Sequence, residues 1–248
     1  MIDLELNPTI DLKREGKSFY WASFFLPKKS KKNAGILYSI CRYFDDIADK
    51  DKHDSTKYLK DAIKEIQNNK DNKVNIFLQK NKINNSIFFD LIEGFIFDQK
   101  KILVKDQDEL IKYSYHVAGT VGLMMSNIIG VKNKKAARSA IDLGIGMQLT
   151  NIARDVYEDA QMKRIYLPAG WIPNITLKNL NNPDENTSEQ DEKILNAIHK
   201  TINLSENFYK NGFAGLSYIP FSTRLGIFIA ANVYRGIGIK IKNKKKKY

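Results

Sequence analysis

Acidic side chains recur at helical spacing in two short stretches of the sequence. In YFDDIADK, residues 43–50, Asp45 and Asp49 lie four positions apart, on one face of any helix. Two like charges at that spacing disfavour a helix by a few tenths of a kcal/mol. Either a solvated surface screens that repulsion or a bound cation offsets it. In GMQLTNIARDVYEDA, residues 146–160, spacings of three, four and four align a second polar stripe: Gln148, Asn151, Asp155 and Asp159.

The chemistry of these side chains favours the cation. Each stripe alone is compatible with an ordinary charged helix face, but together they offer carboxylate and amide oxygens, without cysteine or clustered histidine. Such donors suit a hard ion, Mg²⁺ with Mn²⁺ as an alternative. Mg²⁺ takes one or two carboxylates and completes its shell with water and substrate phosphate. With Arg42 and Arg154 nearby, the two stripes predict a clamp for a diphosphate carried on metal ions.

Helical patterning dominates the elements that must position these stripes. Strand-like alternation bounded by tight turns does not recur, so we predict an all-α fold. Two stretches rich in lysine and asparagine, residues 69–73 and 80–85, read as loops, and residues 166–190 form the longest irregular segment. The predicted helices cover residues 31–49, 55–68, 85–99, 107–129, 134–162, 190–210 and 223–242.

Composition narrows the class of protein. The 248 residues are 43% hydrophobic, enough for a sizeable core, and the single cysteine, Cys41, excludes an intramolecular disulfide. The N-terminus has no apolar signal region, and the most apolar window, residues 117–131, is too short and polar to span a bilayer. We therefore expect a soluble, cytoplasmic protein, or one bound only at a membrane surface.

The net charge of +12 comes mainly from lysine, including the C-terminal run Lys244–Lys247. It indicates either a solvated surface or attraction to an anionic partner such as a diphosphate or an acidic lipid. No interleaved basic and aromatic motif is present, so a nucleic-acid partner is not expected.

A run of small residues lies between the two acidic stretches, in YSYHVAGTVGLMMSNIIG, residues 113–130. Gly119, Gly122 and Ser126 share one helical face with Tyr115. Small side chains there permit close helix packing or leave room for a ligand, and the tyrosine ring could face a cation.

These motifs resemble the squalene/phytoene synthase family, and within it bacterial phytoene synthases most. The matching pieces keep their order from about residue 16 to the C-terminus: KSFYWASFFLP (17–27), ICRYFDDIAD (40–49), YHVAGTVG (115–122), QLTNIARDVYEDA (148–160), RIYLP (164–168) and AANVYRGIG (230–238). The resemblance implies the isoprenoid synthase fold, with both acidic motifs facing each other across a central cavity. It also implies one helical domain over residues 1–248, with flexible ends at 1–15 and 243–248.

By position, the resemblance assigns roles to individual residues. Asp45, Asp49, Asp155 and Asp159 would bind metal with Asn151, and with Tyr115 they would be the catalytic residues. A further set would bind substrate: Phe19, Arg42, Gln148, Asn151, Arg154 and Tyr234. Tyr157 departs from the smaller residues common in the family, which predicts an altered cavity mouth, and the chain stops soon after Tyr234.

The reaction implied is head-to-head condensation of two geranylgeranyl diphosphates to phytoene, through a cyclopropylcarbinyl (prephytoene) diphosphate, in carotenoid biosynthesis. It needs Mg²⁺ and no NADPH. Two alternatives stay open: a squalene or dehydrosqualene synthase acting on farnesyl diphosphate, and a non-catalytic assembly homologue. The intact aspartate pairs argue against the second. Because substrate and product are long hydrocarbons, we also expect peripheral contact with the inner face of an anionic membrane, helped by the lysine tail.

Overall fold

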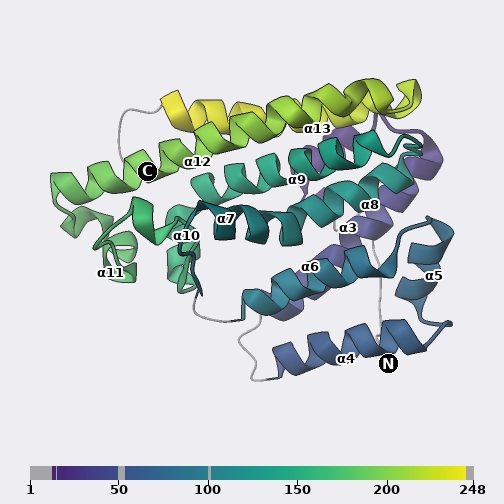
Figure 1. Cartoon of the computed structure of the whole chain (residues 1–248), viewed down its shortest axis with the longest axis horizontal. Coiled ribbons are helices and arrows are strands. Elements are labelled where there is room, and N and C mark those ends of the chain that lie inside the picture. Colours follow the sequence, from purple (N-terminus) through teal and green to yellow (C-terminus); the bar gives the residue numbers. More distant parts are fainter. Residues whose placement is uncertain (1–12, 15, 50–53, 100–101, 244–248) are drawn as a thin grey trace.

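The computed structural model describes residues 13–14, 16–49, 54–99 and 102–243, and this part of the chain is almost entirely helical. The all-α prediction is confirmed. In Figure 1, α12 and α13 lie along one side of the molecule, α9 lies beneath them, and α4 forms the opposite edge. The helices are α2 (Lys17–Ser23), α3 (Lys28–Asp49), α4 (Ser55–Asn68), α5 (Lys73–Lys80), α6 (Asn85–Phe97), α7 (Gln107–Ser114), α8 (Thr120–Ile128), α9 (Lys135–Arg154), α10 (Val156–Gln161), α11 (Leu177–Asn181), α12 (Ser188–Ala214) and α13 (Phe221–Asn243).

Local capping explains where several helices begin. Asn72 accepts hydrogen bonds from two backbone N–H groups at the start of α5, and Asp106 accepts one from Glu109 at the start of α7. Thr187 and Gln190 form a reciprocal capping box before α12. Each cap satisfies N–H groups that have no partner within their own helix.

Two predicted helices are interrupted, and three short helices were not predicted. The helix expected over 107–129 contains a π-helical turn, Tyr115–Gly119, between α7 and α8. The helix expected over 134–162 bends at Asp155, whose φ of −102° and ψ of 17° lie outside the helical range. Helices α2 and α5 had no predicted counterpart, and α11 forms inside the stretch predicted to be irregular.

Two large apolar clusters hold the helices together. One joins α3, α4, α5, α6 and α8, and Phe44 packs edge-on against Phe88 at its centre, with ring centroids 5.5 Å apart. The other joins α10, α11, α12 and the end of α13. Helix α9 extends along α12 and α13, and its own buried residues connect the two regions.

Small residues allow α8 and α9 to pack at very short range, and Gly122, Ser126 and Gly144 also line the cavity described below, so the two alternatives left open by the sequence occur together. A Cβ atom added to Gly122 would lie 2.1 Å from the backbone oxygen of Ala140. One added to Gly144 would lie 2.3 Å from that of Ala118. Glycine is therefore needed at both positions for close helix packing.

A two-residue parallel strand pair, β1 (Ile102–Leu103) and β2 (Arg164–Ile165), ties the segment before α7 to the segment after α10. It brings the end of α6 next to the second acidic stretch. Within the described residues, no helix has both the length and the apolar character needed to cross a bilayer. The predicted flexible N-terminal segment and the lysine tail lie almost wholly outside the described residues.

Candidate active site

The two acidic stretches stand at the same end of one cavity. Helix α3 lines this cavity from Ala34 to Cys41, and Asp45 follows one turn later. Helix α9 lines it from Ala136 to Asn151, and Asp155 again follows one turn later. On both helices the cavity-lining residues are therefore followed by the aspartates, which lie together at the polar end of the cavity.

Partial burial makes Asp45, in the first pair of aspartates, harder to ionise. Arg42 contacts both neighbouring aspartates, at 2.8 Å from Asp45 and 2.7 Å from Asp46. Burial raises the pKa of Asp45 to about 7; the nearby charge of Asp49 adds to this, and Arg42 opposes it. Without a further cation, the pair therefore carries its full charge poorly near neutral pH.

The second pair repeats this arrangement. Arg154 donates two hydrogen bonds of 2.6 Å to the carboxylate of Asp155. Burial raises the pKa of Asp159 to about 7, with a further contribution from Asp155, while the charge of Arg164 opposes the shift. In the first pair, Asp45 is both held by arginine and costly to ionise, whereas in the second pair arginine holds Asp155 and burial makes Asp159 costly to ionise.

An unpaired amide oxygen lies beside the second pair. Asn151 donates a hydrogen bond to Gln148 at 3.3 Å, and both residues line the cavity. The Oδ1 atom of Asn151 is buried and has no hydrogen-bond partner. An orphaned buried oxygen costs stability unless a ligand satisfies it. Its chemistry fits a hard cation or a water bound to one.

These donors do not form a closed metal cage by themselves. Among the described side chains, no group of three histidine, cysteine, aspartate or glutamate residues is close enough to hold an ion. Mg²⁺ usually takes only one or two protein carboxylates and completes its shell with water and phosphate oxygens. The open arrangement of oxygen donors therefore fits a metal that arrives with a diphosphate.

Arg164 links the two pairs and was not predicted as a site residue. It follows α10 on β2, donates a 2.9 Å hydrogen bond to Asp49 on α3, and lies close enough to Asp159 to lower the pKa of that carboxyl. Its position in the matched RIYLP stretch was the available signal.

Asp98, at the end of α6, is a negatively charged neighbour of Arg164 and was not predicted as a site residue either. Its nearly buried carboxylate accepts hydrogen bonds from Tyr113 at 3.0 Å and Tyr166 at 2.7 Å. The two tyrosine rings stack with centroids 4.7 Å apart. Burial raises the pKa of Asp98 to about 6, although Tyr166 and Arg164 oppose the shift. A single aspartate after an apolar helix gave no sequence signal of this network.

The cavity itself is apolar and has a volume of about 320 Å³, within the range of small-molecule sites. Its wall comes from α2, α3, the π-helical turn, α8, α9, the end of α12, the segment before α13, and α13 itself. Phe19 on α2 and Tyr234 on α13 both line it and stack on each other, with ring centroids 5.1 Å apart. Tyr38 lines the cavity one turn before Arg42. Such a wall excludes water and presents aromatic faces to whatever enters.

Two of the residues singled out in the sequence are not part of the cavity lining. Tyr115, at the start of the π-helical turn, donates a 2.9 Å hydrogen bond from its hydroxyl to Asp90 of α6. Its assignment as a catalytic residue stays a prediction. Tyr157 packs against the apolar cluster around α11 and α12, and its effect on the cavity mouth stays a prediction.

Comparison with known proteins shows which family has similar sequences. The sequence profile described as squalene/phytoene synthase matches residues 12–248. The chain is 32% identical over 246 residues to the 15-cis-phytoene synthase of Enterobacter agglomerans, covering 91% of this chain and 81% of the relative. It is 30% identical over 260 residues to that of Pantoea ananas, covering 95% and 82%.

Solved structures show the same architecture. A dehydrosqualene synthase crystallised with a ligand superposes with a TM-score of 0.80 at 28% identity, covering 92% of this chain and 82% of that one. A squalene synthase from Alicyclobacillus acidocaldarius gives the same TM-score at 18% identity, covering 94% and 90%, and supports the fold alone. The predicted isoprenoid synthase fold is confirmed.

Proposed function

The chain belongs to the squalene/phytoene synthase family, and from that premise we propose that it condenses two geranylgeranyl diphosphates head to head into phytoene. That it is a prenyltransferase-type enzyme follows from its relatives. The observation that carries the proposal is the pair of acidic stretches at one end of an apolar cavity. We further propose that residues 1–248 act as one prenyl synthase domain.

The family is of the divalent-metal-dependent isoprenoid synthase type. We propose Mg²⁺, with Mn²⁺ as an alternative, held by Asp45, Asp49, Asn151, Asp155 and Asp159. When bound, such a cation neutralises charge on a diphosphate and makes it a better leaving group. Arg42 and Arg154, already beside the carboxylates, would bind the remaining phosphate oxygens.

The hydrocarbon chains would lie in the cavity. In the first step the C1–O bond of one substrate breaks, and diphosphate leaves with the electron pair. The double bond of the second substrate attacks the allylic cation, and loss of a proton closes a cyclopropane ring. The second diphosphate then leaves, the ring rearranges to a 1,1′ linkage, and proton loss forms the central double bond. No hydride is required, so NADPH is not expected to be needed.

Side chains of this chain would protect and guide those cations. The apolar wall keeps water from quenching them. The stacked rings of Phe19 and Tyr234 offer negative ring faces inside the cavity. Gln148 and Asn151 lie where the cavity wall meets the acidic end, in position to orient the diphosphate.

The alternative is a dehydrosqualene or squalene synthase that uses farnesyl diphosphate, and the structural similarity to a dehydrosqualene synthase favours keeping it. Product analysis separates the two. Purified protein receives geranylgeranyl or farnesyl diphosphate with Mg²⁺, with and without NADPH, and mass spectrometry identifies the hydrocarbon. We expect phytoene from the longer substrate without NADPH. A C30 product alone, or one that requires NADPH, contradicts the proposal.

We also propose peripheral contact with an anionic membrane, because substrate and product are long hydrocarbons and the chain carries a net charge of +12. We propose that this contact is made at the inner face of the cytoplasmic membrane. The lysines at 244–247 lie outside the described residues, so their predicted part in this contact stays a prediction.

A further inference from the structure

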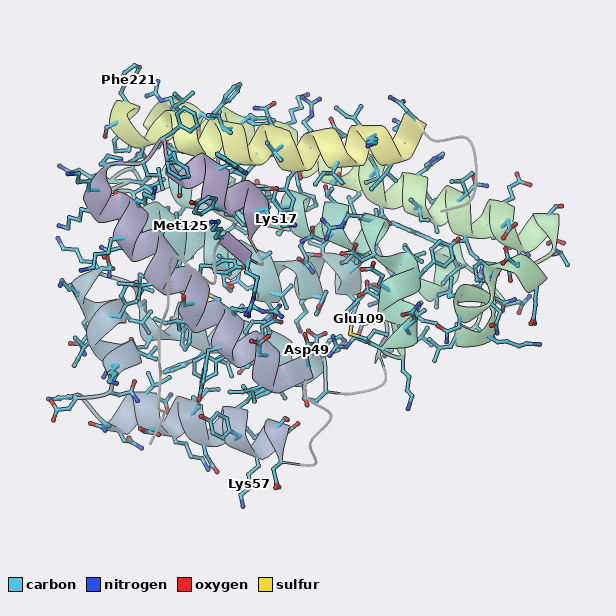
Figure 2. The ribbon with its side chains drawn as sticks, turned by 180° about the vertical axis from the view of Figure 1, so that it is seen from behind. Lys17, Asp49, Lys57, Glu109, Met125 and Phe221 are labelled. Atoms are coloured by element: carbon cyan, nitrogen blue, oxygen red, sulfur yellow. The ribbon has the colours of Figure 1, made fainter. Side chains whose placement is uncertain are left out.

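Large apolar side chains are exposed together on α2 and α13. Trp21 is 67% exposed and Phe221 is 88% exposed, values unusual for residues that bury so much surface when packed. Figure 2 shows Phe221 at the outer edge of the molecule, projecting away from the end of α13. We call the exposed set the aromatic face: Trp21, Phe24, Phe25, Phe221, Leu225 and Phe228.

The two segments that carry the aromatic face are in direct contact. A Cβ atom added to Gly226 would lie 2.9 Å from Leu26 and 3.1 Å from the backbone oxygen of Ala22. At the other end of the contact, Phe19 stacks on Tyr234. Helix α2 therefore runs antiparallel along α13, and members of the aromatic face are exposed on both helices.

Charge around the aromatic face has one sign. Residues 16–44 and 207–248 contain no aspartate or glutamate, whereas lysine and arginine occur in both segments. Lys28, Lys29 and Lys32 are exposed directly after Phe24 and Phe25, and the ammonium group of Lys31 lies 3.6 Å from the ring centre of Phe24. A surface that combines exposed aromatic rings with basic side chains complements the headgroups and acyl boundary of an anionic bilayer.

The opposite side of the same two helices lines the cavity. Phe19, Ala22 and Leu26 of the α2 segment face inward, as do Gly226 and Ala230 of α13. One layer of helix therefore separates the cavity from the aromatic face. Glycine and alanine keep that layer thin where α2 crosses α13.

We propose that the aromatic face docks on an anionic lipid bilayer, with α2 and α13 lying in the interface. Resting on the proposed function, this orientation places the cavity wall against lipid, where a hydrocarbon product can leave without crossing water. A second copy of the chain is a poorer occupant, because it would bring another face of the same positive charge against this one.

Vesicle sedimentation tests the apolar part of the docking surface. The double variant Trp21→Ser, Phe221→Ser is compared with wild type on vesicles of phosphatidylcholine mixed with phosphatidylglycerol. We expect its binding to weaken at least about tenfold, because both rings lose their burial in lipid. The control, Ile76→Ser with Leu103→Ser, removes two exposed apolar residues elsewhere and should bind like wild type. Equal binding of all three proteins overturns the proposal.

The lysines give a second, independent comparison. Replacing Lys28, Lys29 and Lys32 with glutamine should weaken binding to the anionic vesicles. Replacing two exposed lysines of α4, Lys57 and Lys60, should have little effect. Equal effects of the two sets of substitutions would contradict a localised docking surface.

Tryptophan fluorescence reports the orientation directly, because the chain contains only Trp21 and Trp171. In a Trp171→Phe variant, the emission of Trp21 should shift to shorter wavelength on anionic vesicles and be quenched by brominated lipid. Unchanged emission on vesicles that bind the protein would overturn the proposal.

Activity in detergent micelles keeps this proposal separate from the proposed function. Trp21 and Phe221 do not line the cavity, so their double variant should keep wild-type turnover on solubilised substrate. Vesicle docking without any prenyl transfer would refute the proposed function alone. Normal prenyl transfer with unaltered vesicle binding by the double variant would refute the docking alone. The docking alone would also be refuted if the double variant lost a dimer formed by wild type while its vesicle binding stayed the same.

Discussion

Replacing Asp98 with asparagine should make the protein more stable and less active. The carboxylate is nearly buried close to the charge of Arg164, and burial raises its pKa from 3.8 to about 6. Because the folded-state pKa lies above the unfolded one, the native state binds this proton more tightly. The free energy of unfolding therefore falls as pH rises from about 4 to about 6, and stays lower above that.

The size of the effect follows from the two pKa values. Each pKa unit corresponds to about 1.4 kcal/mol, so the ionised carboxylate costs about 3 kcal/mol at and above neutral pH. Asp98→Asn removes the charge, and the amide can still bond both Tyr113 and Tyr166. We expect the variant to exceed wild type by about 2–3 kcal/mol at about pH 8, and to match it near pH 4.

Urea unfolding followed by circular dichroism across this pH range measures the difference. Exposed Asp61, changed to asparagine, is the control and should shift stability by less than about 0.5 kcal/mol. Turnover should fall in Asp98→Asn, because Arg164 loses a negative neighbour that holds it beside Asp49. A variant that is less stable than wild type at high pH would refute the reasoning, since the attraction between Asp98 and Arg164 would then outweigh the cost of burial.

Asp45→Asn and Asp159→Asn should each lower turnover with Mg²⁺ by orders of magnitude while thermal melting shows an intact fold; near-full activity in either variant would remove that residue from the site. Gly122→Ala should destabilise the protein by about 1–3 kcal/mol in urea unfolding, because its new methyl group would meet a backbone oxygen of α9 at 2.1 Å. Gly236→Ala, whose methyl group would meet nothing within 4 Å, should instead add about 0.5–1 kcal/mol, and equal effects of the two glycine changes would contradict the packing argument.

The spacing of apolar residues in the sequence predicted helices whose position depends on their own residues alone. The helix expected over residues 55–68 is α4 with the same bounds, because its apolar positions recur on one face. The small residues in 113–130 allowed either close helix packing or room for a ligand, and the structure shows both. Gly122 packs against the backbone of Ala140 and also lines the cavity, and both of these neighbours are set by the tertiary fold.

The deviations from helical periodicity could not be predicted in this way. The bend at Asp155 preserves hydrogen bonds from its own N–H to Asn151 and from Asp159 to its carbonyl, so the pattern of side chains barely changes. The π-helical turn at Tyr115–Gly119 shifts the register of the residues that follow it, and Tyr115 at its start donates a hydrogen bond to Asp90. One extra residue per turn leaves little trace in composition.

The residues of the candidate site also fall into those that the sequence could predict and those that it could not. Residues that repeat within one helix, such as Asp45 and Asp49, are visible in the sequence. The network of Asp98, Tyr166 and Arg164 joins α6 to β2, and a short strand pair brings these segments together. No spacing rule relates residues 68 positions apart, so the sequence could not predict this network.

The repulsion between the aspartates now has a specific physical account. Arg42 compensates Asp45, Arg154 compensates Asp155, and Arg164 compensates Asp49 while lowering the pKa of Asp159. A cation that takes over these carboxylates would free the guanidinium groups to bind phosphate oxygens. We therefore expect inorganic diphosphate and Mg²⁺ to strengthen each other's binding, since each removes a charge that opposes the other. Calorimetric titration of diphosphate with and without Mg²⁺ measures this coupling. If diphosphate binds equally well in both titrations, the arginines are permanent partners of the carboxylates and do not exchange.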